Sequence, residues 1–155
     1  MSSYRVRTAT VDDVGVIAQH RAAMFRAMGL VPDAEYATLA AGSARVLANA
    51  LAAGTYRGWL TELDRDVVAG AGVILRPLLP RPGQPDGATE VEVLNVYTEP
   101  QHRRCGLARG LMHAVLAWCA AQRFAKVTLH ASDAGRPLYE SLGFSATNEM
   151  EWKAR

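Results

Sequence analysis

Cysteine is scarce in this sequence. Only Cys105 and Cys119 occur among 155 residues. Two cysteines cannot build a disulfide framework, and their separation does not match the ligand spacing of a zinc site. The four histidines also stand far apart and show no metal-ligand spacing. The sequence therefore predicts no metal site and a reducing compartment, the cytoplasm.

Long apolar runs are also missing. Half of the residues are hydrophobic, but no uninterrupted apolar run is long enough to cross a bilayer. The first residues, MSSYRVRTAT, contain no apolar segment of the kind found in signal peptides. We therefore expect neither a membrane partner nor export.

Charge is nearly balanced, with a formal net charge of +2. Apart from Arg103 and Arg104, the basic residues are scattered among acidic ones, whereas a nucleic-acid-binding surface needs clustered positive charge. The sequence thus argues against a nucleic-acid partner. Repeats, low-complexity tracts and linkers are absent, so residues 1–155 are expected to form one domain with a substantial core.

The most informative stretch is a predicted strand, a basic turn and a predicted helix in succession. Val91, Val93 and Val96 supply β-branched bulk typical of a strand, and Pro100 ends it because proline has no N–H to donate. From Gly106 onward, apolar residues recur at three- and four-residue steps. This period predicts a helix of about four turns.

The turn before this helix has no Ser, Thr, Asp or Asn at the N-cap position, so the first helical N–H groups lack a side-chain partner. Arg103 and Arg104 stand beside these donors. Gly106 and Ala108 are small enough to let a ligand approach the backbone. Together with the positive end of the helix dipole, these residues favour an anion, most naturally a pyrophosphate.

The pattern Arg103-x-x-Gly106-x-Ala108 resembles the Arg/Gln-x-x-Gly-x-Gly/Ala motif of the GCN5-related N-acetyltransferase (GNAT) family, which in that family cradles the pyrophosphate of acetyl-coenzyme A (acetyl-CoA). A second segment, RPLYESLGF at residues 136–144, is similar to the family's helix that ends in Leu-Tyr-Glu-x-Leu-Gly-Phe. The resemblance is strong over residues 90–153 and looser before them.

The expected elements form a mixed α/β arrangement with helices on both faces of the sheet. Strands are predicted at residues 4–8, 55–63, 67–75, 90–98 and 126–131, with a last strand or hairpin half at 144–153. Helices are predicted from a capping box at Thr10 to about Met28, and at 34–53, from 106 and at 133–142. The resemblance implies a GNAT-like α/β fold with a mixed, mostly antiparallel sheet, splayed between its fourth and fifth strands. The proline-rich stretch 76–88 is expected to stay unpaired, as a passive surface loop or as a flap over the acceptor pocket.

The resemblance also implies acetyl-CoA as the co-substrate, bound where the sheet splays. Its expected contacts are Val96, Tyr97, Thr98, Arg103, Arg104, Cys105, Gly106, Leu107, Ala108, Arg109 and Ser132. Ser132 stands where many relatives have an Asn, and alternatively it is the N-cap of the following helix.

The chemistry requires an amine to lose a proton and a thiolate to gain one, because an alkylammonium titrates near pKa ~10.4. By the resemblance, Glu92 matches the general base of the histone acetyltransferase members. Glu90 faces the same side, and it or a water is the alternative base. Tyr139 matches the tyrosine that protonates the coenzyme A sulfur in many relatives. The alternatives are that both glutamates are merely solvated and that Tyr139 only packs on its helix neighbours.

The acceptor is less defined. Arg21, Met24 and Phe25 are candidate substrate-binding residues, by analogy with the family's first helix pair. Arg21 either pairs with a carboxylate-bearing acceptor, such as an amino acid, or is an exposed salt-bridge partner. We expect an N-acetyltransferase that acts on a primary amine of a small molecule or peptide by direct ternary-complex transfer. The alternatives are a non-catalytic acyl-CoA-binding module or, less favoured, a phosphate binder of another fold. Acceptor identity and a homodimer stay open.

Overall fold

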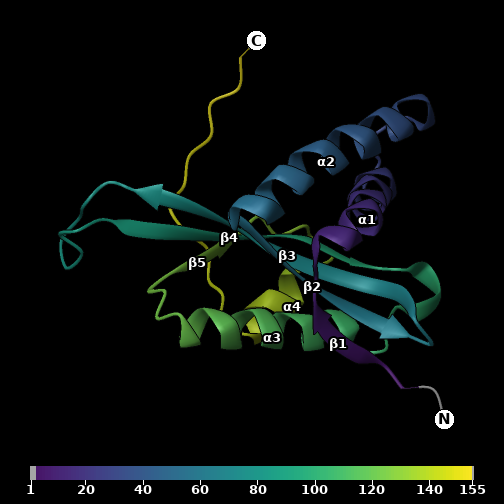
Figure 1. Cartoon of the computed structure of the whole chain (residues 1–155). Coiled ribbons are helices and arrows are strands. Elements are labelled where there is room, and N and C mark those ends of the chain that lie inside the picture. Colours follow the sequence, from purple (N-terminus) through teal and green to yellow (C-terminus); the bar gives the residue numbers. More distant parts are fainter. Residues whose placement is uncertain (1–2, 155) are drawn as a thin grey trace.

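The computed structural model describes residues 3–154 and contains one five-stranded sheet (Figure 1). Its strands are β1 (Arg5–Thr8), β2 (Tyr56–Leu63), β3 (Asp66–Leu78), β4 (Ala88–Thr98) and β5 (Val127–Leu129), in the order β1-β2-β3-β4-β5. Neighbours from β1 to β4 pair in antiparallel fashion, and β5 joins β4 in parallel. The predicted mixed, mostly antiparallel α/β sheet is therefore confirmed.

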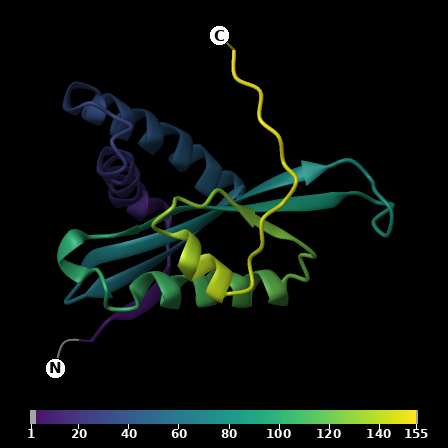
Figure 2. The same cartoon turned by 180° about the vertical axis from the view of Figure 1, so that it is seen from behind.

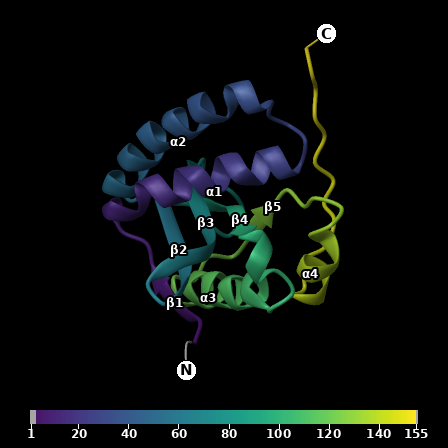
Figure 3. The same cartoon turned by 90° about the vertical axis from the view of Figure 1, so that its right-hand side faces the viewer.

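Helices cover both faces of the sheet (Figure 3). On one face lie α1 (Val14–Ala27), which follows the short 3-10 turn η1 (Val11–Asp13), and α2 (Asp33–Ala53). On the other face lie α3 (Leu107–Ala121), which follows η2 (Pro100–His102), and α4 (Arg136–Ser141). Because strand side chains alternate between faces, β4 sends Val91 and Val93 into the core under α3, while Leu94 packs on the α1 and α2 side.

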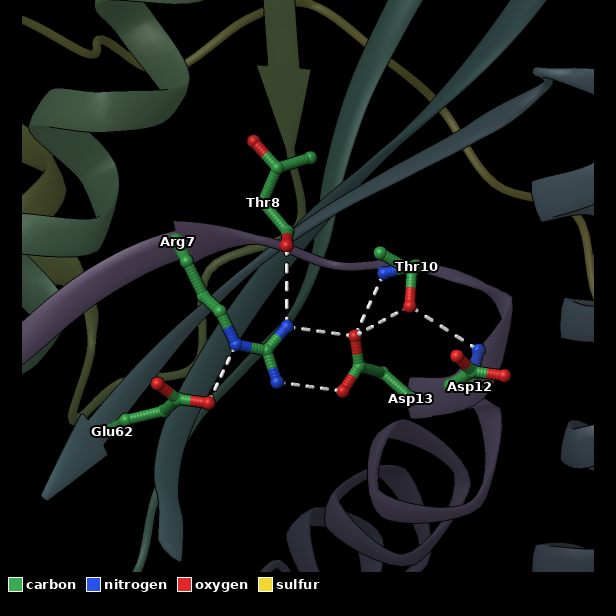
Figure 4. A network of polar contacts seen from close by, with 6 residues as sticks. All are labelled: Arg7, Thr8, Thr10, Asp12, Asp13 and Glu62. Carbon is green, nitrogen blue, oxygen red and sulfur yellow. Dashed lines mark hydrogen bonds and ion pairs between the residues drawn. The ribbon is translucent and has the colours of Figure 1, made fainter. Parts of the chain in front are cut away.

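The predicted capping box is present at η1, the 3-10 turn that leads into α1 (Figure 4). The Thr10 N–H donates to Asp13 Oδ2 at 2.7 Å, and the Asp12 N–H donates to Thr10 Oγ1 at 3.3 Å. Arg7 on β1 pairs with Asp13 at 2.8 Å and with Glu62 on β2 at 2.6 Å. This guanidinium lowers the pKa of the Asp13 carboxyl. One arginine thus ties β1, β2 and the beginning of α1 together.

The proline-rich stretch differs from the prediction, because its two ends are part of the sheet. Pro77 pairs with Thr89 and Leu78 with Ala88, so the β3–β4 hairpin extends beyond the other strands (Figure 1). The pairing of β2 with β3 ends at Tyr56 and Ile74, so beyond Ile74 one edge of β3 has no neighbouring strand. Pro77 lies in this part of β3, where its missing N–H costs no hydrogen bond to β2. The connecting loop is consequently shorter than expected.

The predicted last strand at residues 144–153 is wrong. Within the described chain, residues 144–154 form neither helix nor strand. Phe144 packs on the core and Glu149 lies 3.8 Å from His130, and the end of the segment then leaves the body (Figure 2). A strand needs a ladder partner, and β5 is itself only three residues long, against the six predicted at 126–131. The side chains of Met150 and Trp152 are accordingly 94% and 86% exposed.

The sheet opens between β4 and β5, as the resemblance implied. Their parallel pairing covers Val91, Val93 and the residue between them, and it ends where Val93 meets Leu129. Beyond that point β4 continues for five residues to Thr98 without β5 beside it. No helix among residues 3–154 is long and apolar enough to cross a membrane.

Candidate functional site

The N-terminus of α3 is built to expose its N–H groups. Gly106 is its N-cap, and within residues 3–154 no side chain caps this helix. Gly106 has a φ of +75°, a left-handed conformation that glycine adopts without a steric penalty. The first bond that closes a helical turn runs from the Gly110 N–H to the Gly106 carbonyl at 3.0 Å. The N–H groups of residues 107–109 therefore stand at the start of the helix, as predicted.

The three predicted arginines around this turn lie in different settings. Arg103 donates from Nε to the Thr98 carbonyl at 3.1 Å and so braces the end of β4. Arg104 is exposed and has a φ of +61°. Arg109 donates from Nη2 to Ser141 Oγ at 2.9 Å, which ties α3 to α4. Exposed Cys105 contacts the Arg103 carbonyl at 3.5 Å. Arg103 and Arg104 therefore supply positive charge at the turn, whereas the Arg109 guanidinium also holds α4 against α3 through Ser141.

A bulge in β4 lies where the sheet opens. Tyr97 pairs with Gly70 and Leu94 pairs with Gly72, so two residues of β4 oppose one residue of β3. Asn95 has a φ of +56° there, a conformation that asparagine tolerates better than most residues. The bulge places Val96 and Tyr97 at the open edge of β4, and Thr98 follows at its end.

The two candidate basic carboxylates share one guanidinium. Arg76 on β3 donates from Nε to Glu90 at 3.0 Å and from Nη2 to Glu92. His130 Nδ1 lies 3.1 Å from the second oxygen of Glu92. The Glu92 side chain is 18% exposed, whereas that of His130 is 74% exposed. Both glutamates are therefore ion-paired, which differs from the alternative that they are simply solvated.

His130 was missed from the sequence because an isolated histidine carries no motif. The parallel register, in which Glu92 pairs with Thr128, brings the residue after β5 next to that carboxylate. The contact between His130 and Glu92 thus depends on how β4 pairs with β5, which the sequence does not show.

Tyr139 lies on α4 against the core under α3. Its ring meets that of Phe144 edge-on at 6.0 Å, and burial raises the pKa of its hydroxyl. No hydrogen-bond partner for this hydroxyl is found in the part of the chain that the structure describes. Ser132 accepts a bond on Oγ from the Gly135 N–H at 3.1 Å. Ser132 thus closes the turn that precedes α4, which is why this helix begins at Arg136 and not at residue 133.

A cavity of about 940 Å³ lies between α1, α2 and the sheet. Its lining includes Arg21 and Phe25 from α1, and Leu94 and Asn95 from β4. Met24 is not among the described residues that line it, and neither are those of the β3–β4 loop. In this arrangement that loop is a surface loop and not a flap over the cavity.

A polar chain crosses the floor of this cavity. Arg21 donates from Nη1 to Asn95 Oδ1 at 2.7 Å, and Asn95 Nδ2 donates to Tyr56 Oη at 3.2 Å. Asn95 and Tyr56 are 5% and 4% exposed. Neither was identified from the sequence, although a polar residue within the apolar run of β4 was a signal at Asn95.

Comparisons with known proteins agree with this arrangement. A family model described as an acetyltransferase (GNAT) domain matches residues 33–154. The solved structure of a GCN5-related N-acetyltransferase from Ralstonia eutropha JMP134 is similar at 32% identity and a TM-score of 0.87, and the match covers 98% of this chain and 99% of that chain. A search of the curated proteins found no match.

More distant structures share the fold. A predicted acetyltransferase with acetyl-CoA from Clostridium acetobutylicum is 24% identical, with a TM-score of 0.87 over 98% of this chain and 96% of that chain. A ribosomal-protein-alanine N-acetyltransferase from Brucella melitensis biovar Abortus is 18% identical, with a TM-score of 0.69 over 99% of each chain. These matches extend over the first helix pair, which lies mostly outside the strongest sequence motifs.

Proposed function

The chain belongs to the GNAT acetyltransferase family, and we propose that it transfers an acetyl group from acetyl-CoA directly to a primary amine of a small molecule or peptide. The observation that carries this proposal is the uncapped N-terminus of α3 beside the open edge of β4. The N-terminus of α3 suits a pyrophosphate, and the open edge of β4 suits an extended pantetheine arm. The amine would lie in the cavity under α1 and α2, and the reaction would take place in the cytoplasm.

Cofactor binding in this proposal uses the helix start and the strand edge. The N–H groups at residues 106–109 bind the pyrophosphate, and Arg103 and Arg104 compensate its charge. The edge of β4 at residues 96–98 hydrogen-bonds the pantetheine amides. Ser132 and Cys105 border this site, and each contacts a backbone group of the protein, the Gly135 N–H and the Arg103 carbonyl respectively. The Clostridium acetobutylicum structure, which is described with acetyl-CoA, supports this choice of co-substrate.

In this proposal Glu92 and Tyr139 carry the proton transfers. Glu92 takes a proton from the ammonium form of the acceptor, directly or through a water. The amine nitrogen then bonds to the thioester carbonyl carbon, the C–S bond breaks, and the nitrogen releases a second proton to water, so that a neutral amide forms. Tyr139 gives its proton to the departing sulfur, since burial raises its pKa and keeps it protonated at neutral pH. Glu90, which shares Arg76 with Glu92, is the alternative base.

Exposed His130 gives the proton a route to solvent. Its Nδ1 contacts Glu92, and its side chain is 74% exposed. An imidazole can accept a proton on one ring nitrogen and release one from the other, so His130 can pass a proton from Glu92 to water. We assign His130 this relay role in the proposal.

Two substitutions test the proposal against a non-catalytic acyl-CoA-binding module. Glu92→Gln and Tyr139→Phe should each lower the rate of coenzyme A release by roughly 10²-fold, the lower end of the range for general acid–base catalysis. Acetyl-CoA affinity, measured by calorimetry, should stay unchanged. Glu140→Gln is the matched control, because Glu140 lies on exposed α4 surface beside Tyr139. Transfer that is indifferent to both substitutions would overturn the assigned roles, and binding with no transfer to any amine would favour the module.

A further inference from the structure

Arg21 is a half-buried charge without an anionic partner. Its guanidinium donates to the neutral amide oxygen of Asn95 at 2.7 Å and lies 4.7 Å from the centre of the Phe25 ring. Considering residues 3–154 alone, no carboxylate forms an ion pair with it, whereas Arg7 and Arg76 each hold two. The alternative that Arg21 is an exposed salt-bridge partner is therefore wrong.

Leaving such a group unpaired is costly in the absence of a ligand. Burial lowers the pKa of Arg21, which shows that its charged form is partly desolvated. A guanidinium carries five N–H donors, and the bond to Asn95 uses one of them. Arg21 also lines the cavity, so an anion that enters finds a positive charge and free donors.

The rest of the cavity describes the rest of the ligand. Its walls are mainly apolar and include Phe25, Leu39, Val46, Leu47, Ile74 and Leu94. The charged lining residues are Arg21, Arg45 and Glu35, two positive and one negative, and the last two are exposed on α2. A net lining charge of +1 suits a single negative charge better than a phosphate dianion.

The proposed base Glu92 is not among the described residues that line the cavity, but it adjoins two that are. Ile74, which lines it, pairs directly with Glu92 across the β3–β4 ladder. Leu94, which also lines it, follows Glu92 by two residues on the same face, about 7 Å along the strand. A ligand with one end at Arg21 can therefore present its other end to Glu92.

We infer that the acceptor is an amine that carries a carboxylate and an apolar body, such as an apolar amino acid. Its carboxylate pairs with Arg21, its apolar part lies against Phe25 and Leu94, and its amine points toward Glu92. This inference rests on the proposed acetyl transfer, in which the amine proton passes to Glu92 and the acetyl group leaves the sulfur for the nitrogen.

The test compares phenylalanine with phenylalaninamide, which has the same amine and ring but no carboxylate. The wild-type protein should show a kcat/KM for phenylalanine at least about tenfold above that for the amide, because a charged hydrogen bond to Arg21 is lost. Arg21→Gln should remove this preference through a higher KM for phenylalanine, with kcat unchanged. Arg21→Lys keeps the positive charge but not the planar pair of N–H donors, so it should keep part of the preference for phenylalanine.

Arg26→Gln is the matched control. Arg26 lies five residues further along α1, is exposed, and stacks over the Tyr36 ring at 4.2 Å instead of lining the cavity. It should leave the preference for phenylalanine intact. Equal or better use of the amide by the wild-type protein would overturn the inference, and so would a clear preference for O-phosphoethanolamine.

A binding measurement separates this inference from the proposed function. N-acetylphenylalanine has no free amine, so its affinity reports the carboxylate site without any transfer. The wild-type protein should bind it at least about tenfold more tightly than Arg21→Gln does. Such binding without acetyl transfer to any amine would refute the proposed function and keep the carboxylate site. Transfer with no effect of Arg21 on either ligand would refute the site and keep the function.

Discussion

Tyr56, which forms part of the cavity floor, depends on the absence of a side chain at Gly72. Gly72 lies in the middle of β3, between Gly58 of β2 and Leu94 of β4. A Cβ atom at this position would lie 2.1 Å from Tyr56 Oη and 2.4 Å from its Cζ. Tyr56 is only 4% exposed and accepts a hydrogen bond from Asn95, so its ring cannot clear an added Cβ without losing that bond. Gly72→Ala should therefore expel the phenol ring.

The magnitude of this effect follows from two losses. An aromatic side chain that leaves the core forfeits about 1.5 to 3 kcal/mol of burial free energy. Asn95, which donates to Tyr56 Oη at 3.2 Å, is left with an unsatisfied buried amide, at a cost of about 1 to 3 kcal/mol. Partial relaxation reduces the sum, so we expect Gly72→Ala to lower the free energy of unfolding by about 3 kcal/mol.

Urea unfolding followed by circular dichroism measures this change. Gly15→Ala on α1 is the control, because its added Cβ meets no described atom within 4 Å beyond its chain neighbours and the adjoining helix backbone, and alanine should stabilise a helix by up to about 1 kcal/mol. Adding Gly72→Ala to a Tyr56→Ala variant should cost almost nothing more, because the colliding ring is already gone. A Gly72→Ala protein within about 0.5 kcal/mol of wild type would refute the reasoning.

Four further predictions concern other parts of the fold. Asp13→Asn should lower the free energy of unfolding by about 2 kcal/mol at pH 7. Because the pKa of Asp13 is lowered in the folded protein, wild-type stability should fall as the pH drops below ~3.9, and an equally steep fall in the variant would contradict the role of this carboxylate. Burial lowers the pKa of His20, so the free energy of unfolding should fall as the pH drops below ~6.5, and it should fall less in His20→Gln. An NMR titration that gives His20 in the folded protein a pKa at or above that value would contradict this prediction. Ala108→Glu, which puts a carboxylate in the first turn of α3, should weaken acetyl-CoA binding at least about tenfold by calorimetry, and unchanged affinity would move the phosphate site elsewhere. Trp152→Ala should change the free energy of unfolding by less than about 0.5 kcal/mol, because the side chain is 86% exposed. The part of the tryptophan fluorescence that this variant loses should be accessible to a soluble quencher in the wild-type protein, and a Trp152 shielded from the quencher would contradict the extended, exposed segment.

Local chemistry explains why much of the fold was predictable. The capping box at Thr10 and the uncapped turn at Gly106 each depend on residues within a few positions, and both are present as expected. The apolar period of α3 likewise reports a face that the structure buries. Such features are encoded next to where they act, so the sequence suffices to locate them.

Features that depend on pairing between distant segments were not predictable. Pro77 lies in the sheet because β2 ends before it, and residues 144–154 form no strand because no described strand pairs with them. The contacts of Arg21 with Asn95 and of Glu92 with His130 join residues 74 and 38 positions apart. Sequence reasoning proposed Arg21 and Glu92 but had no means of finding their partners.

The most direct test of the account is coenzyme A thiol release from acetyl-CoA, measured across pools of amino acids, polyamines, aminoglycosides and peptides. We expect release above the amine-free rate, greatest in the pool of apolar amino acids, and strongly reduced by Glu92→Gln. Release that no pool raises above the amine-free rate, from a protein that still binds acetyl-CoA, would contradict it.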